Sequence, residues 1–320
     1  MRIFLTGGSG FVGGAVAKAF GGRHDITALS RSEKSDAVLT ALGARPARGD
    51  LETVSAEVLK GADAVIHAAA FVEEWGPVAA YEAANVTGTE RMLRAAKDAG
   101  VRRFVHVGTE AALFYGQHMR DIDETCPLAP DSPFPYSATK ARAEAAVLKA
   151  NDPKNGFETI AIRPRLIWGE GDRTILPVVK AMAEAGKFAW IDGGRAMTST
   201  THIDNLVHAL ELALTKGAPG EAYFVVDGPP IMFRNFLKPY LKAAGVDLPE
   251  KSAPGLVVRT LANLTEPLYR LTNSASPPPI TRITAHMMSR DCTINDAKAR
   301  AALGYRPVIG VEEGLLRLAG

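Results

Sequence analysis

The chain has 320 residues, of which 47% are apolar and 22% are charged, shares typical of a globular protein and not of a disordered, collagen-like or coiled-coil chain. Its 37 basic and 35 acidic residues leave a net charge of +2, which gives no extended positive surface for nucleic acid. Cys126 and Cys292 lack the spacing of a disulfide framework or a metal site, so no metal is expected. Without an export signal or an apolar run long enough for a membrane span, the sequence predicts a cytoplasmic protein.

The first half of the chain alternates short apolar runs with longer periodic segments. The short runs are typical of buried strands, and the periodic segments are rich in helix formers. This alternation predicts an α/β protein with a doubly wound, parallel Rossmann sheet. Strands are expected at 2–6, 26–29, 64–67, 103–107 and 159–162, and helices at 78–99 and 137–149.

From Trp168 onward the alternation becomes irregular, with proline-rich joints at 229–230 and 277–279. We expect a dinucleotide-binding domain over residues 1–165, to which 196–227 returns, and a smaller, mainly helical substrate lobe over 166–320. The helices of this lobe are expected near 232–245, 255–272 and 311–318.

A glycine-rich turn follows the first strand and precedes a helix. Glycine permits positive φ in such a turn and lets the backbone N–H groups at a helix N-terminus approach a pyrophosphate. The sequence therefore predicts a dinucleotide site formed by Gly7, Gly10, Phe11, Val12 and Gly13.

The end of the second strand indicates which dinucleotide is preferred. NAD-binding proteins usually place a carboxylate there to accept hydrogen bonds from the ribose hydroxyls. Here the residues are Ser30, Arg31 and Ser32, followed by Lys34, which favour a 2′-phosphate and therefore NADP(H) over NAD(H). In the alternative interpretation, Arg31 is a solvated loop cation that stacks on the adenine of either cofactor.

Further cofactor contacts are expected after the third and fourth strands. Asp50, followed by Leu51, could accept a hydrogen bond from the adenine amino group. The small side chains of Ala68 and Ala69 would let the dinucleotide pass close to the edge of the sheet. We interpret His67, which ends the fourth strand, as a core residue and not as a catalytic one.

Tyr136 and Lys140 stand four residues apart at the start of an expected helix, so their side chains share one helical face. A phenol that exchanges protons at neutral pH needs its pKa lowered from about 10 towards about 7, which corresponds to roughly 4 kcal/mol. A lysine about 4 Å away, at an effective dielectric of about 20, supplies about this energy. Lys140 could also donate to the nicotinamide ribose. The alternative is an exposed Tyr and Lys on an ordinary amphipathic helix.

Two further polar residues join this candidate catalytic set. Thr109 follows the fifth strand and could hold a substrate oxygen, or it could cap the strand. Asn85 lies within the expected helix 78–99, where it could bridge the lysine and a water molecule or mark a local kink or a surface position.

With these residues in order, the chain resembles the extended short-chain dehydrogenase/reductase superfamily. Later segments are similar to its 3β-hydroxysteroid dehydrogenase/isomerase branch, which includes 2-alkyl-3-oxoalkanoate reductases and sterol 4-carboxylate dehydrogenases. The segments are Ala161-Ile-Arg-Pro-Arg-Leu-Ile-Trp-Gly-Glu-Gly-Asp172, Thr201-His-Ile-Asp-Asn205, Leu303-Gly-Tyr-Arg-Pro307 and Glu312-Glu-Gly-Leu315.

The resemblance implies hydride transfer between a nicotinamide and a secondary alcohol or ketone. Tyr136 would be the acid/base, Lys140 its activator and Thr109 the substrate polariser, with nicotinamide contacts near Pro164 and Arg165. The chain departs from the family in having Thr109 where a serine is usual and Gly108 in place of a second hydroxyl, which argues against steroid isomerisation.

The segment 255–272 carries an apolar stripe at helical spacing, formed by Val257, Val258, Leu261, Leu264, Leu268 and Leu271. The stripe could cover a site for a small hydrophobic ketone, contact a membrane surface peripherally, or pack against its own protein. A homodimer is also compatible with the sequence.

Two rival functions remain at this stage. A nucleotide-sugar epimerase or dehydratase shares the fold, but Thr109 is followed by Glu110 and Ala111 and not by the Asp-Glu pair of the dehydratases. A non-catalytic NADP-binding redox sensor would not need Tyr136 and Lys140.

Overall fold

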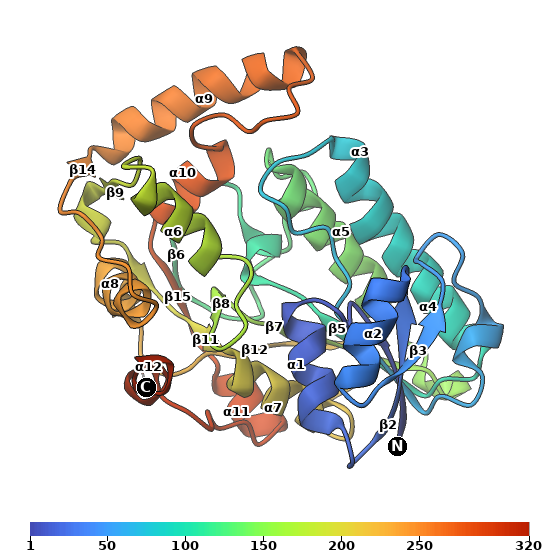
Figure 1. Ribbon diagram of the computed structural model, residues 1–320. Helices are drawn as coiled ribbons and strands as arrows, with labels where there is room; N and C mark the ends of the chain where they lie inside the picture. The colour runs from blue at the N-terminus through green and yellow to red at the C-terminus, as the bar shows by residue number, and fades with distance from the viewer. Residues whose placement is uncertain (320) are drawn as a thin grey trace.

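The computed structural model describes residues 1–319 and is built around a seven-stranded parallel sheet (Figure 1). Every neighbouring pair of strands in this sheet is parallel, in the order β12-β7-β5-β4-β1-β2-β3. The predicted α/β class and Rossmann sheet are confirmed. The strands are β1 Arg2–Thr6, β2 Asp25–Ser30, β3 Arg45–Arg48, β4 Ala64–His67, β5 Arg103–Val107, β7 Glu158–Arg163 and β12 Glu221–Phe224.

Alternating side chains of the strands supply a separate core on each face of the sheet. Ile3 and Leu5 of β1 are buried on one face, and Phe4 between them is buried on the other. The first core is covered by α1 Phe11–Phe20, α2 Glu33–Ala41, α7 Ile203–Ala213 and α11 Ala297–Ala302. The second is covered by α4 Gly88–Asp98 and α5 Pro135–Lys149.

The helix expected at 78–99 is continuous, but its middle turn is irregular. It consists of α3 Val78–Tyr81, the π-helical η2 Glu82–Thr87 and α4. A π-turn inserts one residue into the helical register, and such turns occur frequently at functional sites.

The remainder of the chain forms smaller sheets and helices at the carboxyl ends of the main strands. The three helices expected there are α8 Phe233–Ala243, α9 Gly255–Leu271 and α12 Val311–Ala319. The further elements are α6 Leu176–Glu184, α10 Arg282–Met288, β6 Met119–Ile122, β8 Ile167–Trp168, β9 Trp190–Ile191, β10 Met197–Thr198, β11 Thr201–His202, β13 Ile231–Met232, β14 Ser252–Ala253 and β15 Cys292–Ile294.

The two parts of the chain are interleaved. β12 from the 196–227 segment forms an edge of the main sheet, and β6 from the first half pairs with β15 near the C-terminus. Ala299, Leu303 and Tyr305 are buried in the core beneath α1 and α7. Over residues 1–319 no helix combines the length and the apolar character needed to cross a membrane.

Candidate active site

The glycine loop lies where β1 ends and α1 begins. Gly7 has a φ of +73°, and a Cβ on it would lie 2.8 Å from the carbonyl carbon of Ala68. A Cβ on Gly13 would lie 2.3 Å from the carbonyl oxygen of Gly7. The N-cap residue of α1, Gly10, offers no side chain to the first N–H groups of the helix, where Phe11 and Val12 form the first turn. The loop therefore has the compact form and free donors that a pyrophosphate requires.

The end of β2 keeps one positive side chain free for a cofactor. Ser30 is buried, and its hydroxyl donates to the carbonyl oxygen of Ser32 at 3.2 Å. Ser32 in turn caps α2 by accepting from the Ser35 N–H. Arg31 is exposed and forms no ion pair with any of the described residues. Its charge instead acts on the carboxyl of Asp50, whose pKa it helps to lower.

The residues expected along the rest of the cofactor path lie at the same edge of the sheet. Asp50 closes a turn by accepting from the N–H and hydroxyl of Thr53, both at 2.8 Å, and these bonds lower the pKa of its carboxyl. Leu51 packs into the core beneath α4. The Ala69 N–H donates to the Thr6 hydroxyl, so Ala68 and Ala69 are held against the glycine loop.

His67 is a core residue, as predicted. Its Nδ1 lies 2.8 Å from the Thr6 hydroxyl and its Nε2 lies 3.0 Å from the Thr89 hydroxyl. Burial lowers its pKa to about 3, and the nearby charge of Lys140 acts in the same direction. His67 is therefore a neutral, hydrogen-bonded side chain and is not poised for proton transfer at neutral pH.

Tyr136 and Lys140 both lie on the first turns of α5, which begins with Pro135 in the position that proline favours. The Nζ of Lys140 donates to the carbonyl oxygen of Val107 at 2.9 Å and lies 3.5 Å from Nε2 of His106. Burial lowers the pKa of Lys140 to about 8, although the Glu144 carboxylate opposes this shift.

The pKa of the Tyr136 phenol is raised above its ordinary value, opposite to the lowering by Lys140 that we expected from the sequence. Burial is the main cause, and the Glu110 carboxylate adds to it, while the neighbouring Thr109 hydroxyl works against it. Lys140 does not offset these effects because its ammonium group is directed at the end of β5. The phenol is accordingly protonated at neutral pH.

Thr109 is linked to a buried ion pair that sequence reasoning did not identify. Its hydroxyl accepts from the Ala111 N–H and donates to Oε2 of Glu110 at 2.8 Å. Glu110 pairs with Arg165, each side chain being about 4% exposed or less, and Nε of Arg165 donates to the Thr198 hydroxyl at 3.0 Å. The only indication of this ion pair in the sequence was that Glu110 directly follows Thr109 at the edge of the sheet.

Two other expected residues, Pro164 and Asn85, join neighbouring segments by hydrogen bonds. The carbonyl oxygen of Pro164 accepts from the Glu110 N–H. Asn85 is buried within the π-turn, accepts from the Phe71 N–H at 2.7 Å and donates to the Thr139 hydroxyl at 3.2 Å. Asn85 thereby joins the loop after β4 to α5. It is not a surface residue, and it has no hydrogen bond with Lys140.

A model of the 3-beta hydroxysteroid dehydrogenase/isomerase family matches residues 4–254. The chain belongs to this family. The 4-hydroxy-2-methyl-3-oxo-4-farnesyl-3,4-dihydroquinoline-1-oxide ketoreductase of Stigmatella aurantiaca is 41% identical and spans 100% of this chain and 97% of its own length. The 2-alkyl-3-oxoalkanoate reductase of Stenotrophomonas maltophilia is 34% identical, with 99% and 98% covered.

Among solved structures, the UDP-glucose 4-epimerase of Thermotoga maritima has a TM-score of 0.76 at 18% identity, over 98% of this chain and 96% of that one. At this identity the likeness concerns the fold alone. The family and the relatives identify the protein as an NAD(P)-dependent oxidoreductase of the extended short-chain dehydrogenase/reductase type. Enzymes of this kind interconvert hydroxyl and ketone groups.

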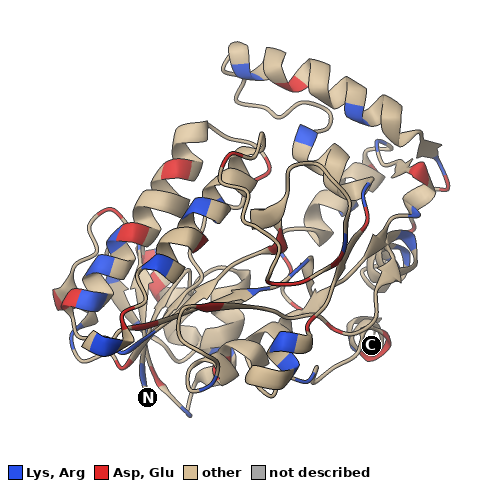
Figure 2. Cartoon of the chain, turned by 180° about the vertical axis from the view of Figure 1, so that it is seen from behind, with Lys and Arg blue, Asp and Glu red and all other residues tan. Residues whose placement is uncertain are grey.

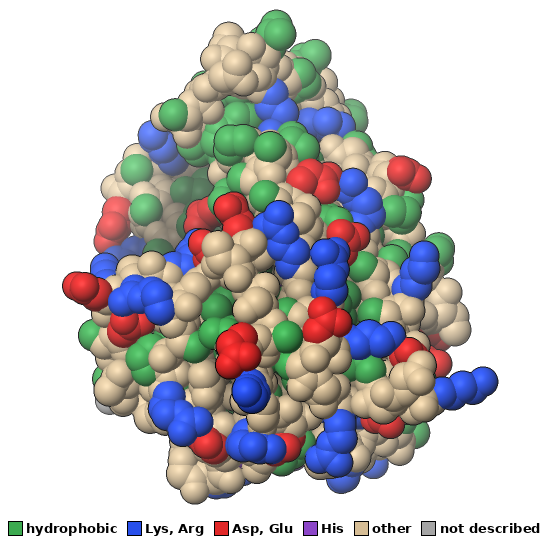
Figure 3. Space-filling view, turned by 90° about the vertical axis from the view of Figure 1, so that its right-hand side faces the viewer, with side chains coloured by type: hydrophobic (Ala, Val, Ile, Leu, Met, Phe, Trp, Pro, Cys, Tyr) green, Lys and Arg blue, Asp and Glu red, His purple; other side chains and the backbone are tan. Residues whose placement is uncertain are grey.

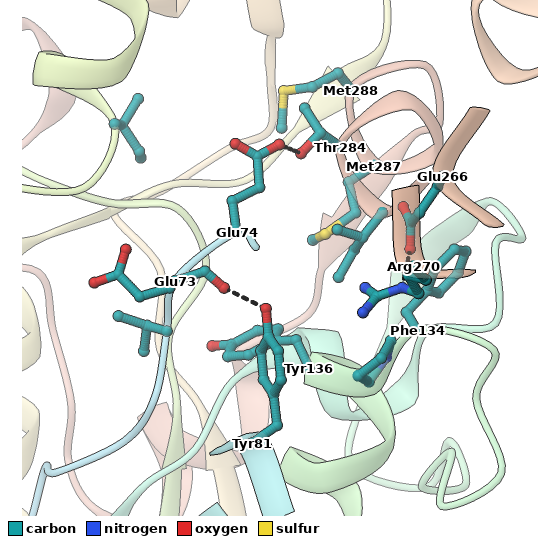
Figure 4. A pocket seen from close by; sticks show the side chains of 14 residues that line it. Glu73, Glu74, Tyr81, Phe134, Tyr136, Glu266, Arg270, Thr284, Met287 and Met288 are labelled. Atoms are coloured by element: carbon teal, nitrogen blue, oxygen red, sulfur yellow. Dashed lines mark hydrogen bonds and ion pairs between the residues drawn. The ribbon is translucent and has the colours of Figure 1, made fainter. Parts of the chain in front are cut away.

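In this family member, a cavity of about 270 Å³ opens beside Tyr136 (Figure 4). Its lining is mainly apolar and includes Met287 and Met288 of α10. Glu74 accepts hydrogen bonds from Thr281 and Thr284, so it ties the loop after β4 to α10. The lining residues are Val72, Glu73, Glu74, Tyr81, Phe134, Pro135, Tyr136, Ile175, Glu266, Arg270, Ile283, Thr284, Met287 and Met288.

Helix α9 covers this cavity with the face opposite to the one expected. Glu266 and Arg270 face the cavity, joined by a 3.0 Å ion pair, and the Arg270 guanidinium lies 4.4 Å from the Trp75 ring centroid. Leu264, at the middle of the apolar stripe, is 66% exposed. The helix thus borders the cavity with its polar face and not with the apolar stripe, because periodicity shows which residues share a face and not which face contacts the protein.

Proposed function

We propose that this protein uses NADPH to reduce the ketone of a small hydrophobic molecule to a secondary alcohol, or catalyses the reverse reaction, with Tyr136 as the acid/base. The observation that carries the proposal is the position of Tyr136, which borders the apolar cavity and has the Thr109 hydroxyl as a neighbour that lowers the pKa of its phenol. A substrate carbonyl in the cavity can therefore approach both the Tyr136 phenol, as proton donor, and the Thr109 hydroxyl.

The geometry of the glycine loop fits a dinucleotide, since Gly7 and Gly13 let the loop pack against its own backbone more closely than any side chain would allow. A bound nicotinamide cofactor supplies or accepts the hydride. We propose that Arg31 and Ser32 contact the 2′-phosphate, that Asp50 contacts the adenine, and that Lys140 contacts the ribose.

The electrostatics of the site favour reduction. Burial and the Glu110 carboxylate raise the pKa of Tyr136, so the phenol holds the proton that a carbonyl oxygen needs as it becomes an alkoxide. Thr109 is the hydroxyl next to the phenol, and its position is fixed by the bonds to Glu110 and the Ala111 N–H. In the reverse direction Lys140, whose pKa is about 8, supplies positive charge near the site at neutral pH.

The composition of the cavity speaks against a nucleotide sugar. Its one arginine, Arg270, is already paired with Glu266, and Glu73 and Glu74 would repel a diphosphate. Glu110 is held by Arg165, so it is not free to act as a separate acid for dehydration. A hydrophobic ketone meets none of these obstacles.

The proposal is tested by following the nicotinamide absorbance with NADPH and NADH against hydrophobic ketones, 3-oxosteroids and 2-alkyl-3-oxo acids. We expect turnover of at least one hydrophobic ketone with NADPH. Tyr136→Phe should lower kcat by about 10²–10⁴-fold while retaining NADPH binding. Tight NADPH binding without turnover of any ketone would instead support the sensor or nucleotide-sugar function.

The preference for NADPH is tested separately with Arg31→Ala. Loss of one charged hydrogen-bond donor to a phosphate corresponds to roughly 1.5–3 kcal/mol, so the KM for NADPH should rise by at least about tenfold. The KM for NADH should stay within about twofold. An equal effect on both cofactors would show that Arg31 stacks on the adenine.

A further inference from the structure

Helix α9 turns an uncharged, apolar face to the solvent. Six large aliphatic side chains on this face are between 50% and 80% exposed, and the other exposed residues between them are Thr, Asn and Pro. The three charged residues of the helix, Arg259, Glu266 and Arg270, all contact the protein instead. The six side chains, here called the outer stripe, are Leu256, Val257, Leu261, Leu264, Leu268 and Leu271.

The outer stripe lies at one end of the molecule. Figure 1 shows α9 at the top of the view with α10 beneath it, and Figure 2 shows few charges on α9 compared with the helices that cover the main sheet. Exposed apolar side chains scattered singly are ordinary, but a contiguous set on one helix marks an interaction surface.

Three arginines lie beside the outer stripe without an ion-pair partner. Within residues 1–319, Arg259, Arg282 and Arg290 form no salt bridge. Nη1 of Arg259 donates to the Ser289 hydroxyl, and Nη1 of Arg290, the next residue, lies 2.9 Å from Nε2 of His118, so Arg259 and Arg290 lie at the same edge of α9. Arg282 also donates to the side chain of Asn263 at the middle of α9. Figure 3, which looks onto one end of α9, shows hydrophobic side chains at the top of the molecule with basic side chains directly below.

We propose that α9 docks along the surface of an anionic lipid bilayer. The outer stripe enters the boundary between headgroups and acyl chains, and the positive charge of the three arginines at its edge attracts the anionic headgroups. An amphipathic helix with an apolar face and basic residues beside it is the form that interfacial membrane binding takes. The docking does not depend on the proposed reaction, but the opposite face of α9 lines the cavity beside Tyr136, which places the cavity next to the lipid.

A second copy of the chain is a less suitable occupant. The spacing of Val257, Leu261, Leu264, Leu268 and Leu271 would allow two helices to pair. Paired helices, however, usually carry charges at the positions beside the stripe, and these positions here are Thr260, Thr265, Pro267 and Thr272. A two-fold axis through α9 would also bring the unpaired arginines of both copies to the same interface, where they would repel each other.

The test measures sedimentation of the full-length protein with vesicles of phosphatidylcholine and phosphatidylglycerol at a 7:3 ratio, and with vesicles of phosphatidylcholine alone. We expect binding to the anionic vesicles that is at least about fivefold stronger than to the neutral ones and that weakens with added salt. Leu264→Ser/Leu268→Ser should lower the bound fraction at least about fivefold. Arg259→Gln/Arg290→Gln should reduce the difference between the two vesicle types.

The matched control is Val308→Ser/Leu316→Ser, which removes two equally exposed aliphatic side chains elsewhere on the surface and should bind as the unaltered protein does. Circular dichroism and thermal unfolding verify that each variant is folded, and since the readout is binding, a failure of the proposed reaction would not affect it. No binding to anionic vesicles, or equal binding by Leu264→Ser/Leu268→Ser, would overturn the proposal. A lipid-free dimer that these two substitutions dissociate would assign the outer stripe to a second copy instead.

Discussion

Lys140 is a buried ammonium group whose polar partners are the backbone carbonyl of Val107 and a ring nitrogen of His106. Its side chain is 3% exposed, its Nζ donates to Val107, and it forms no salt bridge with any of the described residues. Glu144, one turn further along α5, is instead paired with the buried Arg163. Burying a charge without an ion-pair partner costs free energy of folding, and functional sites are where such costs are usually found.

We therefore predict that Lys140→Met is more stable than the unaltered protein at pH 7. Burial lowers the pKa of Lys140 from 10.5 to about 8. Such a shift corresponds to about 3 kcal/mol in favour of the variant, less about 1 kcal/mol for the lost hydrogen bond to Val107.

The pH dependence of this difference has a definite sign. Between pH 8 and 10.5 the unfolded chain binds the Lys140 proton and the folded chain does not, so the unaltered protein gains stability as the pH rises. The advantage of Lys140→Met in the free energy of unfolding should thus shrink between pH 7 and pH 10, as measured by urea titration. Lys149→Met, at an exposed position of the same helix, is the control, and a pH-independent advantage would contradict the prediction.

The Glu110 carboxylate contributes, after burial, to the raised pKa of Tyr136. Because its carboxylate raises the pKa of the phenol, Glu110→Gln should lower that pKa. In the proposed reaction the protonated phenol supplies the proton for ketone reduction, so the rate should decline at a lower pH in the variant than in the unaltered protein. The measurement is kcat/KM for reduction against pH, and an unshifted alkaline limb would show that another group controls it.

At the level of elements, the sequence predicts the positions of most strands and helices but not the partners of their side chains. The strands at 2–6, 64–67 and 103–107 agree with β1, β4 and β5 residue by residue, because each is a buried apolar run. β3 shows no such run, since Arg45–Arg48 is an exposed edge strand. The glycine loop and the Tyr136/Lys140 pair could be found because their spacing is local.

The contacts that sequence reasoning missed join residues far apart in the chain. Glu110 and Arg165 are separated by 55 positions, and only the parallel pairing of β5 with β7 brings the ends of these strands together. The direction of the α9 stripe depends on how the helix packs on α10 and the cavity. Local periodicity predicts neither the Glu110–Arg165 ion pair nor the direction in which the α9 stripe faces.

The junction of β1 and α1 gives a prediction at this scale. Gly13→Ala adds a Cβ that meets only backbone atoms, those of Gly7 and Gly8, so the loop must shift. We expect NADPH affinity to fall at least about tenfold and stability to fall by about 1–3 kcal/mol. Fluorescence titration with NADPH measures the first effect. Gly310→Ala, where the new Cβ would meet open space, is the control, and equal NADPH affinity in the two variants would contradict the role of the loop.

The whole molecule folds around cores to which both ends of the chain contribute. The core beneath α1 contains Leu206 and Leu210 from α7 and Tyr305 from the C-terminal region, together with Ile3 and Leu5 of β1. The cavity is assembled in the same way, since α5 contributes Tyr136 while α9 and α10 contribute its opposite wall. Neither the core nor the cavity is complete within residues 1–165.

We accordingly predict that residues 1–165 do not fold as an isolated fragment, although they contain the glycine loop and the Tyr136/Lys140 pair. Without α7, β12 and α11, the apolar side chains of one face of the sheet and the edge of β7 would be exposed to water. Calorimetry should show one cooperative transition for the full chain and none for the fragment. A fragment that unfolds cooperatively and binds NADPH would show that the dinucleotide-binding part is an autonomous domain, to which the remaining residues add only the substrate cavity.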